Sequence, residues 1–243
     1  MIQSFVFPEE ITISEQKFNI ESFSNSWKSS ILTLAERILN EYKKKGEGRF
    51  LVAIGGPSGT GKSTISTLLA EIINAQTESE ALHVSLDGYH FEQNYLSNHE
   101  DIEGIKLAEH KGRYDSYNTE KLERDLISFS NVVSLSFPEY SRKEHNPIEN
   151  AIECTTDRTI LLLEGLWLLH NEEPWNRMTK YYDFTVFFNS KQEFREKNTI
   201  TRHVHGGRSQ EESRLFYNKS DKLNDIKIMK NIIPHDLDFM TSV

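Results

Sequence analysis

Apolar and polar positions along the chain predict alternating helices and buried strands. Residues 27–45 carry apolar side chains at helical spacing and end in three lysines, which suit the C-terminal end of a helix dipole. Short, almost wholly apolar runs predict buried strands, because both faces of such a strand must be covered. These runs are 49–56 (RFLVAIGG), 81–87 (ALHVSLD), 159–165 (TILLLEG) and 184–190 (FTVFFNS), and a further strand with a proline near its end is expected at 132–140 (VVSLSFPEY).

Helical segments are predicted between these strands. Apolar residues recur with a helical period over 63–73, and Asn118 is a suitable N-cap for a helix that ends near Ser130. An alternation of strands and helices favours a doubly wound parallel sheet, and 243 residues lie within the range of one domain. We therefore expect a single α/β domain over 1–243, with a helical extension at 1–47.

Two segments interrupt the alternation. Residues 88–118 are polar, rich in Tyr and His and without a sustained period, so we expect an inserted flap of the kind that often carries binding residues. Residues 191–235 are charged and mostly helical in pattern, with a glycine break at 206–207 and a capping box at 209–212 that restarts the helix. A flexible break between helices predicts a mobile helical lid over 195–215.

The segment 56–63 matches the pattern G-x-x-x-x-G-K-[ST] in full, between an apolar run and an amphipathic helix. Its glycines let successive backbone N–H groups point at phosphate oxygens, and the helix N-terminus adds partial positive charge. We expect Lys62 to reach the β- and γ-phosphates of a nucleotide and Ser63 to hold Mg²⁺. The predicted nucleotide-binding residues are Gly56, Pro57, Ser58, Gly59, Thr60, Gly61, Lys62, Ser63 and Thr64. The chain is therefore predicted to have a P-loop NTPase fold.

The phosphate loop alone does not distinguish switches, motors and kinases, which all share it. Residues 218–221 (NKSD) fit the N-K-x-D guanine motif, and 101–104 (DIEG) fit D-x-x-G. In GTPases these motifs follow buried strands, whereas here one lies in the polar flap and the other follows the charged sequence EESRLFY. Four-residue patterns also arise easily by chance, so a GTPase is disfavoured.

Two carboxylates end predicted strands, at the edge of an open α/β sheet where ligands bind. Asp87 ends the strand 81–87, where a carboxylate can accept the proton of an attacking hydroxyl or help hold Mg²⁺; the alternative is a turn or capping role before Gly88. Glu164 ends the most apolar strand, where an unpaired charge is costly, so we expect it to meet a metal ion, water or an arginine. A purely structural ion pair is the alternative for Glu164.

Five segments occur in an order typical of one group of enzymes: LVAIGGPSGTGKST, VSLDGYHF, FPEYSRKEHNPI, LLLEGLWLLHNEEPW and REKNTITRHVHGG. They resemble the uridine kinase, phosphoribulokinase and type I pantothenate kinase family over about residues 48–233. The EG-x-x-LL strand end followed by EPW, and RH-x-x-GG with the later Asp221 and Asn224, are most similar to bacterial nucleoside/nucleotide kinase-like proteins, some described as fructose-transport-system kinases.

The resemblance implies a nucleoside kinase-like fold and a P-loop kinase that uses Mg-ATP. By position it implies Asp87 as the catalytic base, Glu164 as an active-site carboxylate, and Arg195 and Arg202 as lid residues near the phosphates. Two departures from the subgroup leave the substrate open. Leu166-Trp167 stand where the subgroup often has Asn-Tyr, and 114–117 (YDSY) replace its usual proline-rich segment.

The lid segment offers two pairs of candidate residues. Arg195 and Arg202 lie seven residues apart, so on one helix they share a face and can close over the γ-phosphate; a solvated surface is the alternative. His203 and His205 alternate, but neither a Cys cluster nor an H-E-x-x-H pattern accompanies them. A surface or lid role for the two histidines is therefore favoured over a metal site.

Aromatic and basic residues of the flap and of the loops after strands can stack on a polar substrate and hydrogen-bond it. The candidate substrate-binding residues are Tyr89, His90, Tyr114, Tyr140 and Arg142. The candidate Mg²⁺ ligands are Ser63, Asp87 and Glu164. The candidate catalytic residues are Lys62, Asp87, Glu164, Arg195 and Arg202.

Composition narrows the partners and the compartment. Lys plus Arg number 28 against 37 Asp plus Glu, a net charge of -9, so nucleic acid is a poor partner. Cys154 is the only cysteine, which indicates a reducing compartment. The first residues do not read as a secretory signal, and the most apolar run, 159–169, is too short to span a bilayer. We expect a cytoplasmic protein without nucleic-acid or membrane partners, and nothing in the sequence excludes a homodimer.

These features predict a kinase that transfers the γ-phosphate of Mg-ATP to a hydroxyl of a small molecule, such as a nucleoside, a sugar or a pantothenate-like compound. Lys62, the loop amides and the lid arginines would stabilise charge while Asp87 takes the proton. The alternative is a nucleotide-binding regulatory ATPase or GTPase without a small-molecule acceptor. An acceptor pocket made by Asp87 and the aromatic flap distinguishes the two, because a switch does not need one.

Overall fold

Within the described residues, five parallel strands form the central sheet, and four of them coincide with apolar runs of the sequence. The computed structural model describes residues 5–13, 16–46, 48–101, 103–110 and 112–241. The strand order is β4-β7-β3-β8-β9. The strands are β3 (Phe50–Gly55), β4 (Glu80–Ser85), β7 (Thr159–Gly165), β8 (Phe184–Asn189) and β9 (Leu237–Met240). Every residue of β3 and β7 is buried, as expected for strands in the middle of a parallel sheet.

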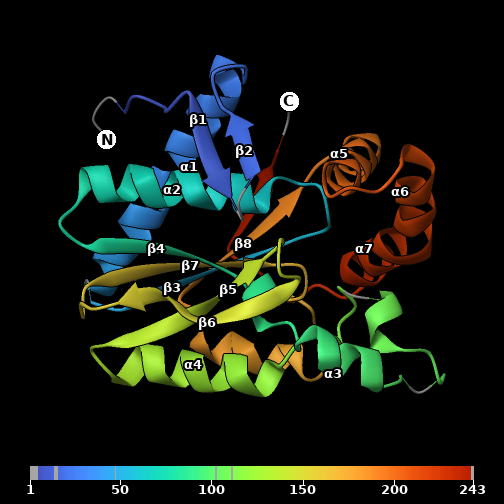
Figure 1. Cartoon of the computed structure of the whole chain (residues 1–243). Helices are drawn as coiled ribbons and strands as arrows, with labels where there is room; N and C mark the ends of the chain where they lie inside the picture. Colours follow the sequence, from blue (N-terminus) through green and yellow to red (C-terminus); the bar gives the residue numbers. More distant parts are fainter. Residues whose placement is uncertain (1–4, 14–15, 47, 102, 111, 242–243) are drawn as a thin grey trace.

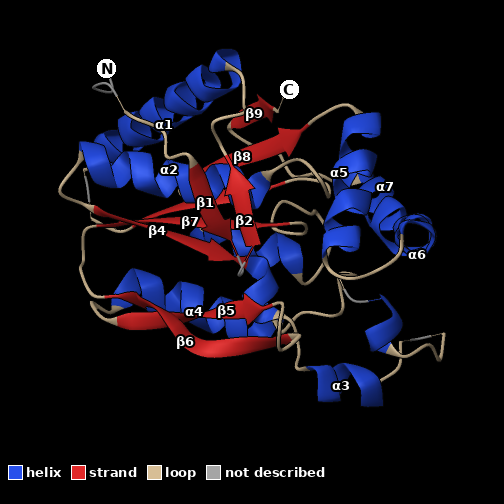
Figure 2. Ribbon diagram, turned by 45° about the horizontal axis from the view of Figure 1, so that its top comes forward, coloured by secondary structure: helices blue, strands red, loops and turns tan. Residues whose placement is uncertain are grey.

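Both faces of the sheet are covered (Figures 1 and 2). One face carries α1 (Asn25–Lys45) and α2 (Lys62–Gln76), and the other carries α4 (Thr119–Asn131) and the hairpin of β5 (Leu135–Ser141) and β6 (Asn146–Cys154). Side chains of β3 alternate between two hydrophobic cores. Phe50, Val52 and Ile54 pack with α1 and α2, whereas Leu51 and Ala53 pack on the side of α4 and β5. This three-layer α/β arrangement confirms the predicted fold class.

The predicted helix at 27–45 is α1, and it belongs to the core. Ser24 caps it by accepting the N–H of Trp27, and it ends at Gly46, whose φ is 97°. A hairpin of β1 (Glu10–Ile13) and β2 (Gln16–Asn19), which the sequence pattern did not predict, precedes it and contributes to the same core. The segment 1–47 is therefore part strand and part helix, although residues 1–4, 14–15 and 47 lie outside the described residues.

Two strands differ from what the sequence suggested. The strand expected at 132–140 is β5, but it pairs antiparallel with β6 outside the central sheet, with a register shift around Pro138. The edge strand β9 was not predicted, because its four residues form no apolar run. It is fixed beside β8 by Asp236, whose Oδ2 accepts the backbone N–H of Thr185 at 2.8 Å and its hydroxyl at 2.7 Å.

The flap at 88–118 contains a short helix, α3 (Gln93–Asn98), and ends at Asn118, whose Oδ1 accepts the N–H of Lys121 at 3.0 Å, as predicted for an N-cap. Ile102 and Lys111 of the flap lie outside the described residues. Short 3-10 segments occur at Leu86–Tyr89, Leu107–His110 and Trp175–Tyr181.

The C-terminal helices gather at one end of the sheet (Figure 1). They are α5 (Gln192–His205), α6 (Gln210–Phe216) and α7 (Lys222–Lys230), with a π-helical turn at Tyr217–Asp221 between the last two. The predicted break at Gly206-Gly207 separates α5 from α6, and the predicted capping box between Ser209 and Glu212 is present in both directions. The helices of the predicted lid are therefore confirmed as secondary structure.

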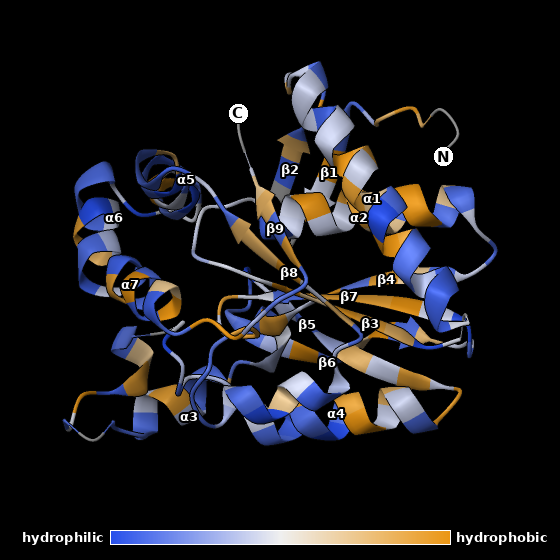
Figure 3. Cartoon of the chain, turned by 180° about the vertical axis from the view of Figure 1, so that it is seen from behind, coloured by the Kyte–Doolittle hydropathy of each residue, from blue (hydrophilic) through white to orange (hydrophobic). Residues whose placement is uncertain are grey.

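Hydropathy follows the layers (Figure 3). The strands of the central sheet are strongly apolar, whereas polar residues dominate α5 and α6. Over the part of the chain that the structure describes, no helix combines the length and the apolar character needed to cross a membrane.

Strand register places the candidate site. β7 pairs with β3 and with β4, so that Glu164 lies opposite Ile54 on one side and Ser85 on the other. The phosphate loop after Gly55 and the turn after Ser85 therefore leave the sheet at the same level as Glu164. These positions form the carboxyl edge at which ligands bind in open α/β sheets.

The variant Ile31→Ala should lower the free energy of unfolding by about 2–5 kcal/mol, because the fully buried side chain leaves a cavity between α1 and the sheet. Urea denaturation monitored by circular dichroism measures this change, and unfolding should remain a single transition if α1 is an integral layer. The control Asn40→Ala, on the exposed face of the same helix, should change stability by less than about 0.5 kcal/mol. Wild-type stability of Ile31→Ala would contradict this packing.

Candidate active site

The loop between β3 and α2 has a conformation that requires glycine. Gly56 has a φ of 145°, and a Cβ there would lie 2.2 Å from the carbonyl oxygen of Phe188. Gly59 has a φ of 72°, and its Cβ would lie 2.3 Å from the carbonyl oxygen of Arg195. The phosphate loop is therefore packed directly against β8 and α5, which leaves no room for larger residues at these positions.

Lys62, at the start of α2, turns its side chain onto this loop. Its Nζ donates to the carbonyl oxygens of Gly56 at 2.8 Å and Pro57 at 2.9 Å. Burial lowers the pKa of the Lys62 ammonium to about 8, although Glu164 and Asp225 act in the opposite direction. An anionic phosphate beside Lys62 would favour the charged form and raise that pKa again.

Ser63 and Glu164 form a hydroxyl–carboxylate pair beside the loop. The Ser63 hydroxyl donates to Glu164 Oε1 at 2.8 Å, and His83 Nε2 lies 3.7 Å from the same oxygen. Burial alone would raise the pKa of Glu164, but the adjacent His83 and Lys62 lower it to about 2. The buried carboxylate is therefore ionised. The sequence led us to expect a metal ion, water or an arginine beside Glu164; within the protein its neighbours include Ser63, His83 and Lys62, and its charge also acts on Arg142.

Asp87 lies at the mouth of the site. It follows β4 in the segment Leu86–Tyr89, where the hydroxyl of Ser85 accepts the N–H of Asp87 at 3.3 Å. The Asp87 side chain is 45% exposed, so its carboxylate is accessible from solvent. Burial raises the pKa of Tyr140 to about 12 and Asp87 adds to this shift, so the two side chains face the same space.

His90 and Tyr117 complete the group around Asp87. The His90 ring lies 4.0 Å from the ring of Tyr117 and 5.7 Å from that of Tyr140, between centroids. His90 Nδ1 lies 3.0 Å from the carbonyl oxygen of Asp87. Burial raises the pKa of Tyr117, and the charges of Asp87 and Glu164 raise it further. The structure thus brings together the predicted residues Asp87, His90 and Tyr140, and adds Tyr117.

Arg142 brings positive charge to this space from the loop after β5. Burial and the nearby Arg202 lower the pKa of Arg142, whereas Asp87 and Glu164 oppose that shift. Arg202 also lowers the pKa of Lys62, after the larger effect of burial. Three cationic side chains therefore act on the same space, which favours the binding of anionic groups there.

Arg195 and Arg202 both lie on α5 but have different surroundings. The Arg202 side chain is 40% exposed, and its Nη2 lies 3.6 Å from Asp221 Oδ1. Arg195 is buried, and its Nη1 donates to Asn189 Oδ1 at 2.8 Å and to the carbonyl oxygen of Ser190 at 2.5 Å. Arg202 is therefore partly accessible to solvent beside Asp221, whereas Arg195 is held at the end of β8.

The histidine pair and the N-K-x-D match lie in surroundings that do not favour a metal site or a guanine site. His203 Nε2 lies 2.8 Å from Asp221 Oδ2, and His205 is exposed, so the two histidines have separate environments. Asn218 donates from its side chain to the carbonyl oxygen of Arg214, within the same helical segment. Residues 218–221 therefore lie in a helix and not in a loop after a strand, as a guanine site would require. Ile102 of the D-x-x-G match lies outside the described residues.

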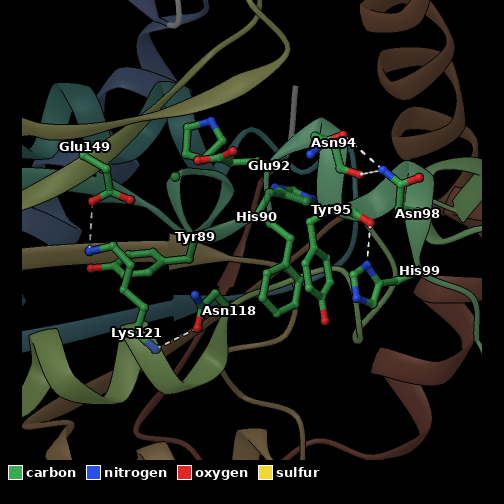
Figure 4. Close-up of a pocket in the computed structure, with 13 residues that line it drawn as sticks. Tyr89, His90, Glu92, Asn94, Tyr95, Asn98, His99, Asn118, Lys121 and Glu149 are labelled. Carbon is green, nitrogen blue, oxygen red and sulfur yellow. Dashed lines mark hydrogen bonds and ion pairs between the residues drawn. The ribbon is translucent and has the colours of Figure 1, made fainter.

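Tyr89 lines a cleft to which Asp87 does not contribute (Figure 4). A cleft of about 510 Å³ under the flap is bordered by Tyr89, His90, Tyr95, Lys121 and Glu149, among others. Lys121 Nζ lies 5.6 Å from the Tyr89 ring and 3.2 Å from Glu149. Burial raises the pKa of Tyr89, with Asp125 and Glu149 adding to the shift. Tyr89 therefore faces the flap cleft, while His90 borders both spaces.

Tyr114 lies away from the other candidates. Its ring meets Trp167 edge-on with centroids 6.0 Å apart, and Lys227 Nζ lies 3.8 Å from the Tyr114 centroid. Trp167 Nε1 donates to the carbonyl oxygen of Gly112 at 2.9 Å. The two departures from the kinase subgroup noted in the sequence therefore pack together, because Trp167 belongs to one and Tyr114 to the other, and their rings are in contact.

Sequence reasoning did not single out three residues of this site. His83 is a polar residue within an apolar strand. This pattern could have indicated a site residue, because a buried polar group needs a partner. Tyr117 was read only as part of the flap, and its position beside His90 comes from an isolated antiparallel bridge between the two residues. Asp225 reaches the phosphate loop from α7, and no local sequence pattern indicates that contact.

Comparison with known proteins agrees with this arrangement. The family model described as "Phosphoribulokinase / Uridine kinase family" matches residues 51–221. "Uncharacterized protein YggC" of Escherichia coli K12 is 28% identical over 186 residues, which cover 75% of this chain and 74% of that protein. "Putative uridine kinase C227.14" of Schizosaccharomyces pombe is 26% identical over 200 residues, which cover 79% and 83%.

A solved structure shares the fold. The crystal structure described as "putative fructose transport system kinase" from Silicibacter sp. TM1040 matches with a TM-score of 0.77 at 24% sequence identity, covering 86% of this chain and 98% of that one. The range matched by the family model contains the phosphate loop, Asp87, Glu164 and Arg202. The family expected from the motifs is thereby confirmed: this chain belongs to the phosphoribulokinase/uridine kinase family of P-loop kinases.

Proposed function

We propose that this protein transfers the γ-phosphoryl group of Mg-ATP to a hydroxyl group of a small molecule. One observation carries the proposal. The accessible carboxylate of Asp87 lies close enough to Lys62 and Arg142 to favour their charged forms, Arg202 acts on the same two cations, and the Ser63–Glu164 pair lies beside the phosphate loop. A base, anion-binding cations and a hydroxyl–carboxylate pair are the groups that phosphoryl transfer to an alcohol needs.

The residues beside the loop fit a Mg²⁺ ion. Mg²⁺ keeps water and phosphate ligands and takes only one or two oxygens from the protein, which the Ser63 hydroxyl and the Glu164 carboxylate can supply. In the described part of the chain no group of three or more His, Cys, Asp or Glu side chains is placed to hold a metal ion, so a site completed by phosphate oxygens is the better match. Asp87 is the third candidate ligand. When bound, Mg²⁺ would neutralise phosphate charge and orient the transferring group.

Each residue has a defined part in the proposed reaction. Lys62, the backbone amides of the loop and Arg202 bind the phosphates and stabilise the charge that spreads over the transferring group. The hydroxyl oxygen of the acceptor bonds to the γ-phosphorus while Asp87 accepts the proton of that hydroxyl. The bond from that phosphorus to the bridging oxygen breaks, and ADP leaves with the electron pair.

The acceptor is proposed to bind between Asp87 and the flap. Tyr140, Arg142, His90 and Tyr117 surround Asp87 with hydrogen-bonding and aromatic groups. Such a mixture suits a polar small molecule, for example a nucleoside, a sugar or a pantothenate-like compound. We further propose that residues 88–118 act as the substrate flap, and that residues 195–215 act as a lid that closes over the phosphates and excludes water.

A regulatory ATPase is the competing function. It needs the phosphate loop and the Ser63–Glu164 pair, but it has no use for Tyr140 and Arg142 beside an accessible Asp87. The acceptor side of the site therefore favours a kinase. The decisive experiment incubates the protein with Mg-ATP and panels of nucleosides, sugars and vitamins, and detects a phosphorylated product by mass spectrometry. ADP formation without any phosphorylated acceptor would favour the ATPase.

The first variant for that assay is Lys62→Ala. It removes the ammonium that neutralises phosphate charge, so turnover should fall below detection while the melting temperature stays near that of the wild type. The control Lys17→Ala removes an exposed lysine of β2 and should retain full activity. Wild-type turnover of Lys62→Ala would remove the basis of the kinase assignment.

The variant Asp87→Asn tests the proposed base. Mg-ATP affinity should change little, whereas phosphate transfer should slow at least roughly 100-fold, the usual scale of general-base catalysis. Single-turnover transfer and equilibrium binding of Mg-ATP separate the two effects. Asp238→Asn, on the exposed edge of β9, is the matched control and should behave as wild type. Near-normal transfer by Asp87→Asn would reduce Asp87 to a turn residue.

The variant Arg202→Ala tests the lid. Transfer should fall by roughly ten-fold to 100-fold, and more than Mg-ATP affinity falls, because a contact to the transferring group strengthens as charge develops. Arg214→Ala, which removes an exposed arginine of α6, should affect neither quantity. Equal losses in affinity and transfer, or no loss at all, would show that Arg202 does not contact the transition state.

A further inference from the structure

Two pairs of opposite charge join α5 to the helical segment that follows α6. Arg202 Nη2 lies 3.6 Å from Asp221 Oδ1, and Arg195 Nε lies 3.7 Å from Asp225 Oδ2. On the first helix the two arginines lie two turns apart, and on the second the two carboxylates lie one turn apart, so each pair occupies one face. In the Arg202–Asp221 pair the arginine is partly exposed, whereas Arg195 and Asp225 are both buried.

Asp225 also reaches the phosphate loop. Its Oδ1 accepts the backbone N–H of Ser58 at 2.8 Å, and Ser58 is itself buried. A buried N–H without an acceptor is strongly disfavoured, so this carboxylate satisfies a donor that the loop conformation leaves without a partner in its own segment. The phosphate loop is therefore held by a side chain from α7, more than 160 residues further along the chain.

The opposite side of the loop is held from α5. Asn198 Nδ2 donates to the carbonyl oxygen of Gly59 at 3.0 Å. Arg195, which pairs with Asp225, is anchored at the end of β8 through Asn189 and Ser190. The two helices thus hydrogen-bond two nearby peptide groups of the loop, at the Ser58 N–H and at the Gly59 carbonyl oxygen.

The ionised carboxylate of Asp225 lowers the stability of the folded chain, so stability alone does not explain why it is buried here. Burial raises its pKa to about 6, even though the Ser58 N–H, Arg195 and Lys62 favour the ionised form; Asp221 adds to the rise. A carboxyl group whose pKa is higher in the folded chain than in the unfolded chain favours folding when protonated. Its contribution to stability therefore falls as the pH rises through about 6. At neutral pH the chain retains a buried charge that reduces its stability, as groups at functional sites often do.

We propose that Asp225 is a positioning residue, which holds the phosphate loop in its nucleotide-binding shape through Ser58 and couples that shape to α5 through Arg195. Asp225 itself does not contact the nucleotide. Arg195 then acts as the anchor of this coupling at the end of β8. The inference rests on nucleotide binding by the phosphate loop, which is part of the proposed function, and it does not depend on the identity of the acceptor.

The test measures the dissociation constant of Mg-ATP and the melting temperature at pH 7.5 for two variants. Asp225→Ala loses both the acceptor for the Ser58 N–H and the partner of Arg195, so Mg-ATP binding should weaken roughly tenfold. Asp225→Asn keeps an oxygen for Ser58 but loses the charge opposite Arg195, so binding should weaken roughly threefold. Because Asp225→Asn also removes a buried charge, its melting temperature should be equal to or above that of the wild type.

The matched control is Asp183→Ala. Asp183 Oδ2 accepts the N–H of Leu51 at 2.8 Å, so this variant also deprives a backbone donor of β3 of its acceptor, but at the end of the strand remote from the loop. Its melting temperature should fall while its Mg-ATP affinity stays within about twofold of the wild type. If the role of Asp225 were purely structural, the Mg-ATP affinity of both Asp225 variants should likewise stay within about twofold of the wild type.

Each outcome separates the alternatives. Mg-ATP affinity within about twofold of the wild type in both Asp225 variants would overturn the positioning role while leaving the kinase proposal intact. The same holds if their affinity loss is matched by Asp183→Ala, since it would then reflect general stability. Failure of the wild-type protein itself to bind Mg-ATP would overturn the positioning role together with the proposed function, and the wild-type titration alone would reveal it.

Discussion

The parallel pairing of β3 with β7 is the constraint on which the candidate site depends. Its register sets Glu164 opposite Ile54, so that the strand carrying the phosphate loop and the strand carrying the buried carboxylate end side by side. Only this alignment allows the Ser63 hydroxyl, one residue into α2, to reach Glu164. A slip of one residue would turn Glu164 to the opposite face of the sheet and place an apolar side chain beside the loop.

Buried charge is concentrated around the loop. Lys62, Glu164, Arg195 and Asp225 are all buried, and each lies near a group of opposite charge from another element. The opposite charges nearby offset part of the free-energy cost of burying each of these groups. The loop backbone is also held by two helices, because the Ser58 N–H donates to Asp225 of α7 and the Gly59 carbonyl oxygen accepts from Asn198 of α5.

Much of the fold could be read from the sequence, because local signals were strong. The apolar runs gave four strands of the sheet, the glycine pattern gave the phosphate loop, and Asn118 and Ser209 gave correct helix starts. The main failures depended on distant contacts, although the local hairpin β1–β2 was also missed. The strand β9 lies beside β8, where Asp236 accepts hydrogen bonds from Thr185, and the strand expected at 132–140 pairs with β6 outside the central sheet. The same limit applies to the candidate site. The places of His83, Tyr117 and Asp225 in it depend on contacts with residues far away in the sequence, which local patterns do not predict.

An anion that approaches the phosphate loop competes with the two carbonyl oxygens to which Lys62 already donates. Orthophosphate can accept the third N–H of this ammonium but makes few further contacts, whereas a triphosphate chain spans the loop amides and makes many contacts at once. We therefore expect the loop to bind ligands with a longer phosphate chain more tightly than orthophosphate.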